Sequence, residues 1–74
     1  MVIKRITRFP KFIKDTKRLD KSVLEKLKKQ ITKVIENPEI GKPLKYKRNE
    51  RTVYVKPFRL IYSVIQEDLI LLKF

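Results

Sequence analysis

The stretch from residue 20 to residue 36 limits what the rest of the chain can become, because its apolar residues recur at the spacing of one helical face. The positions of this apolar stripe are Val23, Leu24, Leu27, Ile31, Val34 and Ile35. The sequence allows two starts. Ser22 with Glu25 fits a capping box, whereas Asp20 as the cap begins the helix two residues sooner. Asn37-Pro38 ends the helix, because the residue before a proline avoids the helical conformation.

A shorter helix and a strand are predicted before this long helix. The span from Phe9 to Leu19 carries apolar side chains at helical spacing, and Pro10 lies in its first turn, where the missing N–H costs nothing. Val2 to Arg8 is rich in β-branched residues and predicts a short edge strand.

Four strands are predicted after the long helix. They cover Leu44 to Arg48, Arg51 to Val55, Phe58 to Ile65 and Leu69 to Phe74. The turns between them are marked by Arg48-Asn49-Glu50, Lys56-Pro57 and Gln66-Glu67-Asp68. The order β-α-α-β-β-β-β predicts one α+β domain, residues 1–74, with two N-terminal helices packed on one face of an antiparallel sheet.

The composition excludes several classes of protein. The chain has 74 residues and neither His nor Cys, so it lacks the usual ligands of zinc, haem and iron–sulfur clusters and the Ser-His and Cys-His pairs of many hydrolases. We expect no cofactor and no metal. The absence of disulfides, of a signal peptide and of a span of about 18 apolar residues favours a cytoplasmic protein with no membrane partner.

The net charge is +12, from 20 Lys and Arg against 8 Asp and Glu. Because 42% of the residues are hydrophobic, this charge belongs to a folding chain rather than a disordered one. Self-repulsion favours an acidic partner or a polyanion that neutralises it. A simpler alternative is that surplus lysines only keep the protein soluble, and it applies to the long helix more than to the central basic run.

Alternation along the strand from Phe58 to Ile65 separates two sets of side chains. The set expected under the helices is Phe58, Leu60, Tyr62 and Val64; the set on the open face is Arg59, Ile61, Ser63 and Ile65. In the preceding strand, Val53 and Val55 share one face, and Thr52 with Tyr54 share the other. An arginine in mid-sheet either binds a ligand or forms a cross-strand ion pair, here with Glu50 or Glu67.

The segment from Leu44 to Arg59 concentrates the basic residues expected to contact nucleic acid. Its cations are Lys45, Lys47, Arg48, Arg51, Lys56 and Arg59, interleaved with Tyr46, Tyr54 and Phe58. Cations bind phosphates and rings stack on bases, so the pattern is typical of a surface for a polyanion with stackable bases. Aromatic residues at strand spacing also pack in cores, and this is the role expected for Phe58 and Tyr62.

Several short motifs occur together over nearly the whole chain. They are Leu19-x-x-Ser22-Val23, Asn37-Pro38, Gly41-Lys42-Pro43-Leu44, the run from Val53 to Tyr62, and Leu69-Ile70-Leu71-Leu72. Together they resemble the RelE/ParE superfamily of toxins from type II toxin–antitoxin modules. The most specific piece is the run from Phe58 to Tyr62, which matches the family's aromatic-Arg-aliphatic-aliphatic-Tyr strand.

The resemblance implies a toxin that is held inactive by an acidic antitoxin protein. In the RelE branch the free toxin enters the ribosome and cuts messenger RNA without a metal, and in the ParE branch it poisons DNA gyrase. The leading interpretation is a RelE-like, ribosome-associated mRNA endoribonuclease. The alternative is a gyrase inhibitor or a catalytically silent protein that only binds the antitoxin. A third interpretation is general nucleic-acid binding through the lysines of the long helix.

The resemblance also implies roles for individual residues. Arg59 matches the family's phosphate-contacting arginine, while the positions of two further strand cations hold Thr52 and Tyr54 here. The expected catalytic residues are Arg59, Lys56, Arg51 and Tyr54, with nucleic acid bound by Lys45, Lys47 and Arg48. Lys56 takes part only if the hairpin shifts, because Pro57 places it in a turn.

Relatives commonly carry a catalytic basic residue and a tyrosine after the last strand. The present sequence stops at Lys73-Phe74. The resemblance therefore implies either that the tail was lost or that this protein lacks that half of the site. Tyr54 or Tyr46 could serve in its place, and the sequence selects neither.

Overall fold

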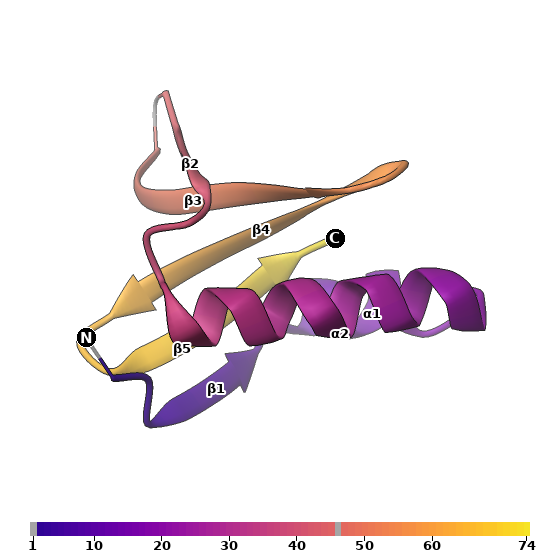
Figure 1. Ribbon diagram of the computed structural model, residues 1–74, viewed down its shortest axis with the longest axis horizontal. Coiled ribbons are helices and arrows are strands. Elements are labelled where there is room, and N and C mark those ends of the chain that lie inside the picture. Colours follow the sequence, from indigo (N-terminus) through magenta and orange to yellow (C-terminus); the bar gives the residue numbers. More distant parts are fainter. Residues whose placement is uncertain (1, 46) are drawn as a thin grey trace.

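The computed structural model describes residues 2–45 and 47–74, and the side chains of Lys47 and Arg48 lie outside the described part. In chain order the elements are β1 (Arg5–Arg8), α1 (Pro10–Thr16), α2 (Lys21–Glu36), β2 (Lys42–Leu44), β3 (Lys47–Val55), β4 (Phe58–Ile65) and β5 (Asp68–Lys73). This is the predicted β-α-α-β-β-β-β order (Figure 1).

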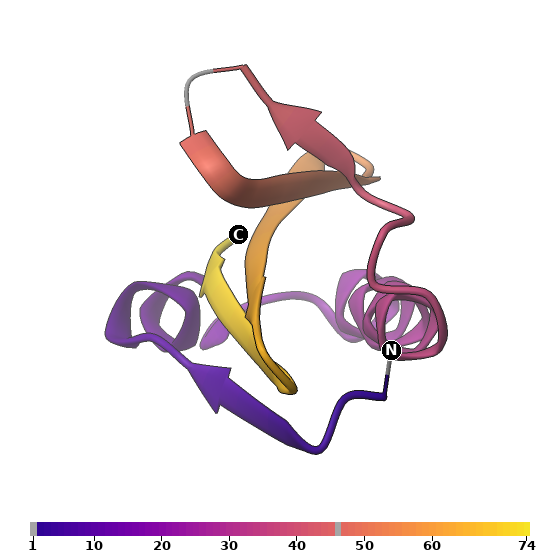
Figure 2. The same ribbon diagram turned by 90° about the vertical axis from the view of Figure 1, so that its left-hand side faces the viewer.

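The five strands form one sheet in the order β1-β5-β4-β3-β2. The last four strands pair antiparallel in succession, as hairpins do, whereas β1 pairs parallel to β5. β1 is therefore an edge strand, as predicted, in a sheet that is mostly rather than wholly antiparallel. A parallel pair needs a long crossover between its strands, and here both helices and three strands supply it. Figure 2 shows β2 and β3 at the opposite end of the sheet from β1, beyond both helices.

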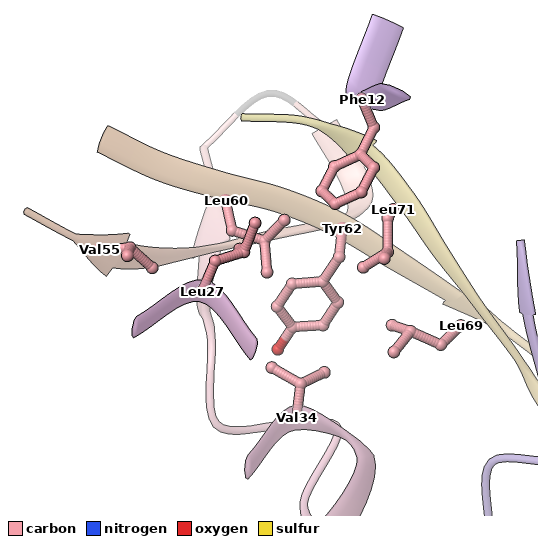
Figure 3. Packing of buried hydrophobic residues seen from close by; sticks show 8 residues of the cluster. All are labelled: Phe12, Leu27, Val34, Val55, Leu60, Tyr62, Leu69 and Leu71. Carbon is pink, nitrogen blue, oxygen red and sulfur yellow. The ribbon is translucent and has the colours of Figure 1, made fainter. Parts of the chain in front are cut away.

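One buried cluster joins both helices to a single face of the sheet. Its members are Phe12, Leu27, Val34, Val55, Leu60, Tyr62, Leu69 and Leu71. Cross-strand partners such as Tyr62 and Leu71 lie on the same face, so α1 and α2 cover the face predicted from alternation. Figure 3 shows the Tyr62 ring in the middle of this cluster, with its hydroxyl directed toward the part of α2 that carries Val34.

The helix boundaries differ modestly from the predicted ones. The cap of α2 is Asp20, the earlier of the two starts, although its side chain makes no capping hydrogen bond. The helix α1 ends at Thr16 rather than at Leu19. Its last turn tightens because the backbone N–H of Lys17 bonds to the carbonyl oxygen of Lys14. Leu19 is outside the helix but still packs against the core.

The turn predicted at residues 48–50 is wrong. The strand β3 runs unbroken through this segment, and Glu50 pairs with Ser63 of β4. The strand before it, β2, covers Lys42–Leu44, whereas the predicted strand runs from Leu44 to Arg48. β2 contains Pro43, which an edge strand tolerates because its outer N–H groups need no partner. The other two predicted turns, Lys56-Pro57 and the one around Gln66 and Glu67, are present.

Candidate functional site

The register of β2, β3 and β4 brings four side chains together on the face away from the helices. Tyr54 is the cross-strand partner of Arg59, and Lys42 of β2 is the partner of Thr52. Alternation places these residues opposite the buried Leu60. The prediction that Arg59 stands on the open face with Thr52 and Tyr54 opposite the valines is therefore confirmed.

These four residues line a hollow of about 290 Å³. The guanidinium carbon of Arg59 lies 5.9 Å from the centroid of the Tyr54 ring, whose residue is 59% exposed. A cation over a ring gains from the ring's negative face, and the planar guanidinium keeps N–H donors at its edge for an anion. The arrangement can hold a phosphate or another oxyanion at the sheet surface.

The alternative of a cross-strand ion pair for Arg59 does not describe the structure. Glu67 instead pairs with Lys4, at 3.3 Å between the Lys4 Nζ and the Glu67 Oε2. Within residues 2–45 and 47–74, no salt bridge joins Arg59 to Glu50 or to any other carboxylate. The guanidinium of Arg59 thus contacts the Tyr54 ring and no carboxylate of the described residues, which leaves its charge available to an anionic ligand.

Two residues of the hollow were missed by sequence reasoning as site residues. Lys42 supplies a second cation from β2, and Thr52 places a hydroxyl in the lining. The Thr52 Oγ1 is buried and has no hydrogen-bond partner among the described residues, a state that costs free energy and leaves an acceptor and donor free in the hollow. Lys42 and Thr52 meet because β2 pairs with β3 in this register. A turn predicted at residues 48–50 shortens β3 and so gives no such pairing from the sequence.

The structure separates Arg51 from the hollow. Arg51 faces the helix side, opposite Tyr62, where its Nη1 donates hydrogen bonds to the carbonyl oxygens of Gly41 at 2.7 Å and of Glu39 at 3.2 Å. It is half-buried. Arg51 is therefore not part of the group around Arg59. Its neighbour Thr52 lines the hollow, and successive side chains along a strand point to opposite faces.

Tyr62 also holds the connector between α2 and β2, residues 37–41, which Arg51 contacts through its two carbonyl acceptors. Its hydroxyl donates to the Pro38 carbonyl oxygen at 2.8 Å and accepts from the Gly41 N–H at 2.9 Å. Burial raises the pKa of the Tyr62 hydroxyl above its ordinary value, against the smaller opposing effects of the Gly41 hydrogen bond and the Arg51 charge. The expectation that Tyr62 packs in the core is confirmed. Together Tyr62 and Arg51 fix the backbone that leads into Lys42.

The remaining expected site residues lie away from the hollow or outside the description. Lys56 is exposed in the turn between β3 and β4 and does not line the hollow. Lys45 is exposed just after β2. Tyr46 and the side chains of Lys47 and Arg48 lie outside the described residues. Phe58 contacts Phe74, with ring centroids 5.1 Å apart, but it is 38% exposed and lies outside the buried cluster, so the core position predicted for it is wrong.

Two other hollows lie near the helices. An apolar groove of about 390 Å³ runs between α1, α2 and the β1 and β5 strands, with Arg8 and Lys28 among its lining residues. A second hollow of about 540 Å³ lies at the end of α1 and is lined by Asp15, Leu19, Phe58 and three basic residues. Among the residues the structure describes, no group of three acidic, His or Cys side chains could hold a metal ion. Neither described helix is both long and apolar enough to span a bilayer.

Comparisons with known proteins agree with this architecture. The sequence model of the family described as "ParE toxin of type II toxin-antitoxin system, parDE" matches residues 3–73. Among solved structures, the crystal structure of the intact E. coli RelBE toxin–antitoxin complex contains a similar chain, with a TM-score of 0.82 and 25% sequence identity. The match covers 92% of this chain and 89% of that chain. A search of the curated proteins gave no match.

The fold and these matches define a toxin of the RelE/ParE superfamily. Within it, the chain belongs to the ParE toxin family of type II toxin–antitoxin systems, whose model spans nearly its whole length.

Proposed function

We propose that this toxin, when free of its antitoxin, acts on messenger RNA at the ribosome and grips the scissile phosphate with Arg59. The observation that carries this proposal is the exposed guanidinium of Arg59, which stacks on Tyr54 beside Lys42 in a hollow with no acid among its described lining residues. Arginine fits a phosphate with two parallel N–H donors, and a cationic site stabilises the charge that develops on the phosphate oxygens.

The reaction that fits such a site is an internal transfer in the RNA itself. The ribose 2′-oxygen attacks the neighbouring phosphorus and loses its proton to a base, the bond to the 5′-oxygen breaks, and that oxygen takes up a proton. The products are a 2′,3′-cyclic phosphate and a 5′-hydroxyl end. Arg59 stabilises the extra negative charge in the transition state, and the Tyr54 hydroxyl and the Lys42 ammonium are the lining groups able to carry a proton.

The inhibitor in this proposal is an acidic antitoxin. The E. coli complex contains its toxin together with an antitoxin. The present chain offers the apolar groove between α1 and α2, with Arg8 and Lys28 in its lining, and a net charge of +12. An amphipathic segment with an acidic edge would bury apolar surface there and neutralise charge at the same time.

Substitution of Arg59 tests the activity. Arg59→Ala should relieve growth inhibition on induced expression, because the phosphate contact is lost, while Lys29→Ala on the exposed surface of α2 should remain toxic. Primer extension on cellular transcripts should reveal new ends with the parent and with Lys29→Ala but not with Arg59→Ala. Undiminished toxicity of the Arg59 variant, at equal protein level, contradicts the proposal.

A second candidate function is inhibition of DNA gyrase, favoured by the match to the ParE family model. It predicts induced DNA damage and inhibited supercoiling by purified gyrase, with transcripts left intact. The same primer-extension experiment separates the two functions, because new RNA ends are expected only from the nuclease.

A further inference from the structure

We propose that Lys42 on the edge strand β2 and Arg59 on β4 bind one phosphate between them, so that the substrate is held by cations from two strands on either side of β3. This inference rests on the proposed action on RNA and names the residue that completes its phosphate site. Both side chains line the same hollow, and Thr52 and Tyr54 of β3 form its floor between them.

The sheet geometry sets the spacing of the two cations. Lys42 pairs with Thr52 and Arg59 pairs with Tyr54, and these β3 residues lie two positions apart on one face. Two steps between strands and two residues along a strand separate the backbones of Lys42 and Arg59 by about 12 Å. Two long side chains that lean toward each other from this distance can close on a single tetrahedral anion above β3.

The charges around the hollow leave both cations available. The acids that the structure places in polar contacts are engaged elsewhere: Asp15 with Lys11, Glu67 with Lys4, and Asp68 with the Thr7 hydroxyl. In the described part of the chain, neither Lys42 nor Arg59 forms a salt bridge. A dianionic or bridging phosphate therefore meets two positive charges and no opposing carboxylate, with Arg59 giving a directional grip and Lys42 a point charge.

The backbone next to Lys42 is fixed from the other face of the sheet. Both polar groups of Gly41 are bonded, its N–H to the Tyr62 hydroxyl and its carbonyl oxygen to Arg51. Pro43 follows, with a ring that fixes its φ angle. Preorganisation lowers the entropy lost on binding, so Arg51 and Tyr62 act here as positioning residues for Lys42.

The test measures phosphate binding directly. We suggest titrating the ¹⁵N-labelled full chain with inorganic phosphate and following its amide resonances, with the parent, Lys42→Gln, Arg59→Gln, the double variant and Lys29→Gln. Residues 42, 52, 54 and 59 should shift in the parent. Lys42→Gln should weaken binding about fivefold or more, and the double variant should bind little worse than either single variant, because one anion needs both cations. Lys29→Gln removes the same charge from α2 and should bind like the parent.

A second arm uses a single-stranded RNA oligonucleotide and measures affinity at several salt concentrations. Loss of one phosphate contact should reduce the magnitude of the slope of log affinity against log salt by about 0.7 for Lys42→Gln. The inference is overturned if Lys42→Gln binds phosphate and RNA as the parent does, or if phosphate leaves residues 42 and 59 unperturbed. Phosphate binding through Lys42 without any RNA cleavage would instead contradict the proposed function alone.

Discussion

Arg51 and Arg59 show that side-chain direction, not residue type, decides what a cation does in this sheet. Both arginines come from the central hairpin and both were expected in one site. In the pairing of β3 with β4, Arg59 lies on the open face and Arg51 lies on the helix side. There Arg51 donates hydrogen bonds to two carbonyl oxygens. Arg59 is available for a ligand, and Arg51 holds the fold.

This difference predicts unequal effects of the same substitution on stability. Arg51→Ala should lower the free energy of unfolding by about 1–2 kcal/mol, because hydrogen bonds to a charged group are lost at a half-buried site. Arg59→Ala should change it by less than about 0.5 kcal/mol, as is usual for exposed positions. Urea unfolding of the two variants measures both, and each serves as the control for the other. Equal losses of stability would contradict the assignment of the two faces.

Gly41 carries a second prediction at the residue scale. A Cβ atom on Gly41 would collide with the hydroxyl and ring of Tyr62, its nearest carbon neighbour lying 2.7 Å away, and Tyr62 is fully buried. Gly41→Ala should therefore cost about 1–3 kcal/mol of unfolding free energy, the usual range for overpacking. The matched control is Ile40→Ala in the same connector, because Ile40 is 47% exposed and fills no tight space. If thermal unfolding finds Gly41→Ala as stable as the parent, the contact with Tyr62 is looser than described.

At the scale of elements, a polar tether joins α1 to the C-terminal end of the sheet. Asp15 accepts a hydrogen bond from Lys11 Nζ at 2.8 Å and another from the backbone N–H of Phe74 at 3.1 Å. The hydrogen bond from Lys11, followed by the one from Phe74, lowers the pKa of the Asp15 carboxyl below its ordinary value of 3.8. The ionised carboxylate is thus preferred in the folded state.

The pH dependence of stability follows from that direction. A carboxyl group whose pKa is lower in the folded state stabilises the protein above its unfolded pKa, and this contribution disappears as the pH falls through the folded pKa. The difference in unfolding free energy between the parent and Asp15→Asn should be constant above about pH 5 and shrink as the pH falls below about 4. Urea unfolding from pH 6 to pH 3 measures it. A difference that persists unchanged at pH 3 would mean that ionisation of Asp15 does not matter.

The elements themselves were largely predictable from local pattern. The stripe of α2 and the alternation in β4 predict the covered face, where Leu60 and Tyr62 are buried. Ile61 and Ser63, which alternation assigns to the open face, are buried as well. The turn at residues 48–50 was wrong because a short polar run resembles a turn, whereas β3 extends through it by pairing Glu50 with Ser63. Long-range pairing overrode local propensity there.

The candidate site was less predictable than the fold. Arg59 and Tyr54 could be placed from alternation in two strands joined by a tight turn. Lys42 could not, because its place in the hollow depends on the pairing of β2 with β3, which the misassigned turn concealed. The burial of Arg51 could not be foreseen either, since its partners are backbone carbonyls of a connector with no periodic pattern.

At the scale of the whole molecule, charge density limits stability. A net charge of +12 is carried by a body whose extents are 31 × 26 × 21 Å. The screening length is about 30 Å at 0.01 M salt, comparable to the whole molecule, and about 8 Å at 0.15 M. The cations therefore repel one another across the fold at low salt and only locally at physiological salt.

This repulsion predicts that stability rises with ionic strength. The melting temperature should increase by several degrees between 0.01 and 0.15 M NaCl, because each kcal/mol of relief corresponds to about 4–8 °C for a domain of this size. The matched comparison is a triple variant, Lys21→Gln with Lys29→Gln and Lys33→Gln, which removes three exposed charges from α2. It should melt higher than the parent at 0.01 M and depend less on salt.

An acidic polymer such as polyglutamate should mimic salt at far lower concentration, since it binds the folded surface. A melting temperature that is flat from 0.01 to 0.15 M would show that an acidic partner is not needed to relieve self-repulsion.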